Sequence, residues 1–145
     1  MTSLALAREV ETRDREVRRS IADLHFLVNC PSEHPSWIAR LRREIDAFSE
    51  HLTCHFALQE SDGYLEHVET QAPQLHDQVD RLHREQHELI RELITLQDAF
   101  AVAASTVLPI LCRRLDALLT RLREHETCKT DLLSEAFNAE PAAMD

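Results

Sequence analysis

Glycine is almost absent from this chain of 145 residues, and this scarcity limits the folds that it can adopt. One glycine and five prolines provide few of the turns that a sheet needs between its strands. The sequence therefore predicts a small number of long helices. The length fits one domain, covering residues 1–145, that can bury a core of its own.

The apolar residues recur at alternating steps of four and three, which is typical of helices packed nearly parallel in a bundle. One such row lies toward the end of the chain and reads Leu111, Leu115, Leu118, Leu122. The row then continues into His125 and Lys129. A second row, which begins at Leu41, likewise ends in His55 and Gln59. We therefore predict an all-α, up-down four-helix bundle whose inward faces become polar at one depth.

Helix-breaking residues place the boundaries of the four helices. Two prolines interrupt "NCPSEHPS" (29–36), and the only glycine lies in "SDGY" (61–64). Ser105 or Thr106 can cap the last helix, with Pro109 in its first turn. The predicted helices cover about 1–28, 36–61, 73–101 and 106–137, with residues 61–73 as a connection.

Charge and hydropathy bear on the expected partners and compartment. A formal net charge of −10 argues against binding to nucleic acid, which relies on clustered Lys and Arg. No segment approaches the ~18 to 20 apolar residues of a membrane span, and none is typical of a signal peptide. We expect a cytoplasmic protein with no membrane partner, whose four cysteines, without a CxxC pair, are free thiols.

Histidine is the residue type that points to a function. His83 and His87 are four residues apart, so one helix face can present both imidazoles. Five histidines fall on predicted inward faces at comparable depth: His25, His55, His83, His87 and His125. Burying so many imidazoles without partners would cost ~1 to 3 kcal/mol for each unsatisfied group, and a shared metal ion would account for all of them. The other four, His34, His51, His67 and His76, are predicted surface residues.

With these motifs the chain resembles bacterial hemerythrin-like proteins, the HHE cation-binding domain family. The resemblance rests on His25, "HFALQE" (55–60) followed by "GYL", "HREQH" (83–87) and "HETCKTDLL" (125–133). It implies a non-heme di-iron site inside a four-helix bundle, used for reversible dioxygen binding, redox sensing, iron handling or peroxide chemistry. By the resemblance, His83, His87 and His125 would bind one iron, and His25 and His55 the other.

The chain departs from the family at both bridging carboxylates. The resemblance places them four residues after His55 and four or five after His125, and these positions hold Gln59, Lys129 and Thr130. An ammonium group has no lone pair to give a metal, and its charge repels cations. Other acids are turned away on an ideal helix, Glu60 by about 140° and Asp131 by about 120°. A π-bulge near the glycine could swing Glu60 inward.

Three functions follow from this pattern. In the first, His83, His87 and His125 bind a single iron or zinc ion that takes a small ligand such as dioxygen. In the second, the bundle is a metal-free scaffold that binds a protein partner or dimerises, and Lys129 replaces the cation beside Gln59 and Glu60. Alternatively, the Lys129 head escapes to solvent and leaves the histidines free.

The third function is an enzyme with a reactive thiol, and it has the weakest support. Cys54 is adjacent to His55, and Cys128 is three residues after His125, so an imidazole could lower the pKa of either thiol. A buried cysteine that acts as a small apolar filler is the favoured interpretation of both.

Overall fold

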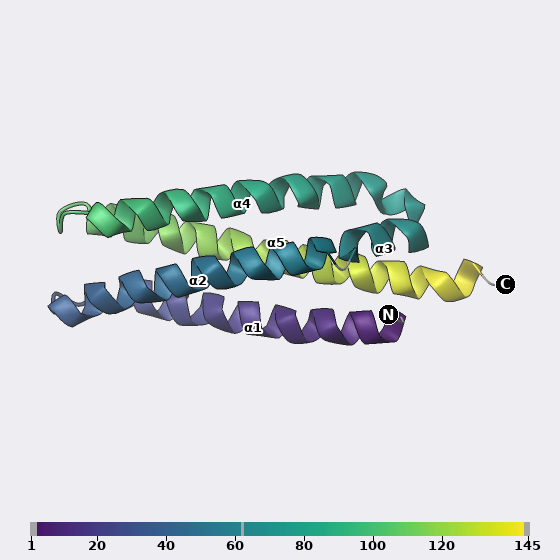
Figure 1. Ribbon diagram of the computed structural model, residues 1–145, viewed down its shortest axis with the longest axis horizontal. Helices are drawn as coiled ribbons and strands as arrows, with labels where there is room; N and C mark the ends of the chain where they lie inside the picture. Colours follow the sequence, from purple (N-terminus) through teal and green to yellow (C-terminus); the bar gives the residue numbers. More distant parts are fainter. Residues whose placement is uncertain (1–2, 62, 144–145) are drawn as a thin grey trace.

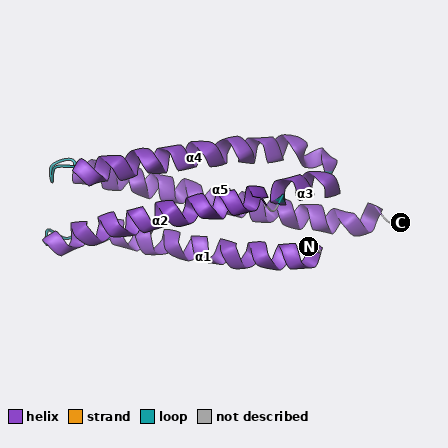
Figure 2. Cartoon of the chain, in the orientation of Figure 1, coloured by secondary structure: helices purple, strands orange, loops and turns teal. Residues whose placement is uncertain are grey.

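The computed structural model describes residues 3–61 and 63–143, and within these ranges it contains helices and no strand. The chain forms α1 (Ser3–Asn29), α2 (Pro35–Ser61), α3 (Tyr64–Gln71), the short 3-10 helix η1 (Pro73–Leu75), α4 (His76–Val102) and α5 (Leu108–Ala143). Figure 2 shows helix along almost the whole chain. In the described part, no helix combines the length and the apolar composition needed to cross a membrane.

The four long helices α1, α2, α4 and α5 lie side by side and alternate in direction (Figure 1). Each of them contacts the long helix before it and the long helix after it, and α5 also packs against α1. The α1–α2 and α4–α5 turns therefore lie at one end of the bundle. Both chain termini and α3 lie toward the other end. The predicted helical bundle is confirmed.

The buried apolar residues form two separate clusters along the bundle. The larger core draws on all four long helices. It includes the apolar rows of α2 and α5, whose buried members are Leu41, Ile45, Phe48, Leu52 and Phe56 in α2 and Leu111, Leu115, Leu118 and Leu122 in α5. Among the residues whose burial is described, the smaller core is built by α3, η1, α4 and α5. These members are Leu65, Val68, Ala72, Leu75, Val79, Leu82, Leu132, Leu133 and Ala136. Buried polar side chains separate the two cores along α4 and α5.

Helix α3 occupies the segment that was expected to be a connection. Leu65 and Val68 are three residues apart, so they share one face of α3 and are buried against the smaller core. Gly63 precedes α3 with φ 68°, a left-handed conformation that only glycine adopts without strain. Pro73 then opens η1, and α4 begins at His76 rather than at residue 73.

The start of α5 also differs from the expected one. The helix begins at Leu108, and the residue before it is Val107, whose carbonyl accepts hydrogen bonds from Ile110 and Leu111. Neither Ser105 nor Thr106 therefore holds the capping position. Pro109 lies in the first turn, as predicted, because the missing N–H costs nothing there.

Candidate functional site

A layer of buried polar side chains lies between the two apolar cores, at the depth where the sequence predicted polar inward faces. We call it the polar layer, and every long helix contributes to it. Its members are Asp14 of α1, His55 and Gln59 of α2, Gln86 of α4, and His125, Glu126 and Lys129 of α5. Each of these side chains is nine-tenths or more buried.

Lys129 is the centre of the polar layer and is only 2% exposed. Its Nζ atom donates a hydrogen bond to Oε1 of Gln59 at 2.6 Å and lies 2.8 Å from Oε1 of Glu126. The ammonium also lies 4.5 Å from the centre of the Phe56 ring, within range of a cation–π interaction. The predicted contact with Gln59 is therefore present, and the alternative in which the Lys129 head reaches solvent is wrong.

Glu126, not Glu60, is the carboxylate that pairs with Lys129. Burial acts to raise the pKa of Glu126. The nearby ammonium of Lys129 and the imidazole of His55 together outweigh this effect, so the pKa lies well below its ordinary range. Nε2 of His55 lies 3.5 Å from the second oxygen of Glu126. Glu126 is therefore ionised, and the ion pair is the electrostatic centre of the layer.

Asp14 closes the polar layer on the α1 side. Burial raises its pKa, and so does a side-chain hydrogen bond to Glu126, while the guanidinium of Arg18 opposes the rise. The raised pKa means that the charged form of Asp14 is less favourable here than in water. Arg18 and Thr130 both donate to Oδ2 of Asp14, at 2.8 and 3.1 Å.

His125 occupies the α4 side of the layer. Burial lowers its pKa and the ammonium of Lys129 lowers it further, although the hydrogen bond to Glu85 acts in the opposite direction. Nδ1 of His125 lies 2.6 Å from Oε1 of Glu85, and Nε2 lies 3.5 Å from Oε1 of Gln86. The depressed pKa favours a neutral imidazole that donates from Nδ1 to Glu85.

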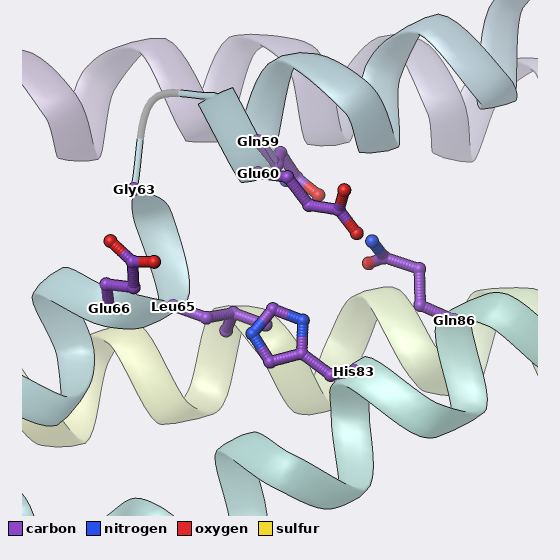
Figure 3. A pocket seen from close by; sticks show the side chains of 7 residues that line it. All are labelled: Gln59, Glu60, Gly63, Leu65, Glu66, His83 and Gln86. Carbon is purple, nitrogen blue, oxygen red and sulfur yellow. The ribbon is translucent and has the colours of Figure 1, made fainter.

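His83 and His87 do not enter the polar layer. His87 is exposed, and its Nε2 atom lies 3.7 Å from the exposed carboxylate of Glu60. His83 is half-buried and lines a pocket of 240 Å³ between the end of α2, the start of α3 and α4. In Figure 3, Glu60 and Gln86 point toward each other across this pocket, and the His83 ring lies beside Leu65.

His25 lies at a different depth from the polar layer. It is four residues before the end of α1, about 6 Å along the axis, whereas His55 is twenty residues after the start of α2, about 30 Å along it. Nδ1 of His25 contacts Oδ1 of Asp116 at 2.7 Å, and Asn29 donates to the same oxygen. These contacts, with that of Asn29 the larger, hold the pKa of Asp116 below its ordinary value.

The residues present do not fit the di-iron centre that the resemblance implies. Of the five predicted ligands, only His55 and His125 are buried in the polar layer, and the ammonium of Lys129 lies among them. Within the described ranges, no three of the five predicted histidines bring donor atoms within 4.8 Å of one another. A cation at this depth would have to displace an ammonium that already neutralises Glu126.

One group of three possible metal donors does meet that distance in the described part of the chain, and it lies on the surface. Glu69, His76 and Asp80 bring donor atoms within 4.8 Å of one another. Nδ1 of His76 lies 2.9 Å from Glu69, and Nε2 lies 3.2 Å from Asp80. The two carboxylates contact opposite edges of one imidazole, which can turn only one nitrogen toward a single ion. The arrangement is that of a surface ion-pair network.

The cysteines give no support to a thiol site. All four are free, as predicted. Cys54 and Cys128, which were expected to be buried fillers, are instead exposed on the outer faces of α2 and α5. Burial raises the pKa of Cys112, the half-buried thiol, which makes it less reactive.

Comparisons with known proteins leave this site without a counterpart. No protein-family model, curated protein or solved structure matches the chain.

The buried ion pair generates a first prediction. Lys129→Met leaves Glu126 without its counter-charge, so we expect the free energy of unfolding to fall by about 3 to 5 kcal/mol in urea titrations. The double variant Lys129→Met with Glu126→Gln removes both charges and should recover most of this loss. Glu60→Gln, which removes an exposed carboxylate, is the control and should change stability by less than about 0.5 kcal/mol. A Lys129→Met protein as stable as wild type would show that Lys129 does not provide the counter-charge of a buried, ionised Glu126.

A second prediction concerns pH. The folded pKa of His125 is depressed, so between that value and the ordinary 6.5 the unfolded chain binds more protons than the native protein. The contribution of His125 to stability is therefore complete above 6.5 and is lost as the pH falls. The stability difference between wild type and His125→Gln should shrink between about pH 7.5 and about pH 5.5. A difference that grows on acidification would show that His125 is protonated in the native state.

Proposed function

We propose that this protein is a hemerythrin-like bundle in which a buried ammonium has replaced the metal, and that it acts as a metal-independent scaffold for protein interaction. The observation that carries the proposal is the position of Lys129. Its Nζ atom lies at the predicted depth of the metal and contacts Gln59 and Glu126. Gln59 and Lys129 are two of the three positions, with Thr130, where the resemblance expects bridging carboxylates, and they bond to each other.

The ammonium can take over the structural part of a metal's role. A metal in a helical bundle joins side chains of several helices at one point and compensates their charge. Lys129 links α5 to Gln59 of α2, and its partner Glu126 contacts Asp14 of α1. The positive charge therefore fixes the depth at which the helices meet, without supplying any redox chemistry.

Exposed apolar side chains support an interaction role. Val102 is 86% exposed at the end of α4, and Val107 and Ile110, across the α4–α5 turn, are more than 40% exposed. Phe26 of α1 is 70% exposed. Val102, Val107 and Ile110 fall within nine residues of the chain at the α4–α5 turn, and apolar side chains gathered on a surface are typical of protein-binding sites. The α4–α5 turn is the surface that we assign to the partner.

Metal content tests the central claim. Protein purified without a histidine tag, from cells supplied with iron and zinc, should contain no stoichiometric metal by mass spectrometry. A metal that binds only the native state would add stability, and chelation would remove it. If no metal is bound, the melting temperature should not change on chelation. One or two ions per chain that are lost in the His125→Ala variant would overturn the proposal and favour the metal-binding alternative.

The interaction surface has its own test. Affinity capture from a lysate of the source organism should recover a partner with wild-type protein that is lost with Val102→Glu/Ile110→Glu. The matched control Ile94→Glu changes an apolar side chain that is 43% exposed in the middle of α4. Recovery of the same proteins by all three baits would exclude the α4–α5 turn as the binding surface.

A further inference from the structure

A second pocket, of 660 Å³, lies at the end of the bundle where the two turns meet, far from the polar layer. We call it the turn-end pocket. It lies between the α1–α2 turn and the start of α5, and its apolar walls include Val28, Trp37, Ile38, Leu108 and Cys112. The volume falls within the range of roughly 300 to 1,000 Å³ found for small-molecule sites, and mostly apolar walls with few polar groups are typical of them.

Trp37 forms a fixed wall of this pocket. Its indole Nε1 donates a hydrogen bond to the carbonyl of Leu27 at 3.2 Å, which holds the ring in one orientation. The ring is half-buried and packs against the larger core. Because it is already held in place, ligand binding does not cost the entropy of immobilising it. An apolar or aromatic group can stack against it at little entropic cost.

Asp116 of α5 supplies a charged anchor in the same pocket. Its Oδ1 atom is held by Asn29 at 2.8 Å and by His25 at 2.7 Å. No contact in the described structure involves its second oxygen, Oδ2, and the side chain is 41% exposed. The carboxylate is therefore oriented in advance and keeps one oxygen available for a ligand.

The charge around the pocket selects the kind of ligand. Glu33 and Asp116 contribute two carboxylates, whereas Arg113 is the one guanidinium among the lining residues, and the chain as a whole carries −10. With the adjacent His25 imidazole neutral, the field in the pocket therefore favours a cation over an anion. His34 also lines the pocket, but its Nδ1 atom is used by Ser36.

We propose that the turn-end pocket binds a small lipophilic amine. Its ammonium donates to Oδ2 of Asp116, and its apolar body lies against Trp37 and Leu108. This ligand site goes beyond the scaffold function proposed above: no residue of the polar layer lines the pocket, whereas Ser105 places it beside the α4–α5 turn assigned to the partner.

The single tryptophan of the chain makes the proposal measurable, because tryptophan fluorescence, excited where tyrosine does not absorb, reports on Trp37 alone. The probe is 2-phenylethylamine, with 3-phenylpropionate as the anionic control and 2-phenylethanol as the neutral control. We expect a saturable fluorescence change with the amine and an affinity at least about tenfold weaker for both controls, the usual effect of losing a charge-assisted hydrogen bond.

Variants separate this site from nonspecific binding. Asp116→Asn should weaken the amine about tenfold and leave the alcohol unchanged, whereas Glu60→Gln, at the other end of the bundle, should change neither. Circular dichroism confirms that each variant is folded, and amide shifts in NMR spectra of wild-type protein should be confined to the residues around both turns. Equal affinity for all three probes, an Asp116→Asn variant with wild-type affinity, or shifts centred on the polar layer would overturn the proposal.

Discussion

The ion pair between Lys129 and Glu126 is the interaction around which the other buried polar groups of the bundle are arranged. An ammonium that is 2% exposed is stable only with a counter-charge and hydrogen-bond acceptors, and Glu126 and Gln59 provide both. The neighbouring groups respond to burial beside the pair: the pKa of Asp14 is raised and that of His125 is lowered, so the charged form of each is disfavoured.

Much of the bundle could be predicted from the sequence, because alternating apolar rows determine which helix faces are buried. Glu126 was missed because it is adjacent to His125 and therefore lies about 100° around the helix from the predicted row. In the structure α5 is covered on two sides, so His125 faces α4 while Glu126 faces α1. Leu118 and Leu119 are adjacent and both are buried. Such pairs of leucines are the sequence pattern from which this wide buried face could have been predicted.

Depth along the bundle was the second source of error. A short turn joins α1 to α2, so residues equally far from that turn lie at the same depth. Counting from the turn places His25 close to the turn itself, far from the depth of His55. The same count brings Asp14 toward the depth of His55. Asp14 also falls on the apolar row of α1, three residues before Val17. The rotamers and partners of these groups could not be read from the sequence, because they depend on which helices meet there.

Among the residues whose burial is described, the smaller core includes none from α1 or α2; α2 ends at Ser61, and α3 packs against this core instead. Helix α3 has eight residues, and the three-residue helix η1 follows it. Helices of this length have little stability of their own and depend on a few apolar contacts. Local opening of α3 would admit water to Gln59 and Gln86 while the larger core stays intact. The bundle thus combines a durable half with a half that exchanges more readily, and the buried charges lie at the boundary between them.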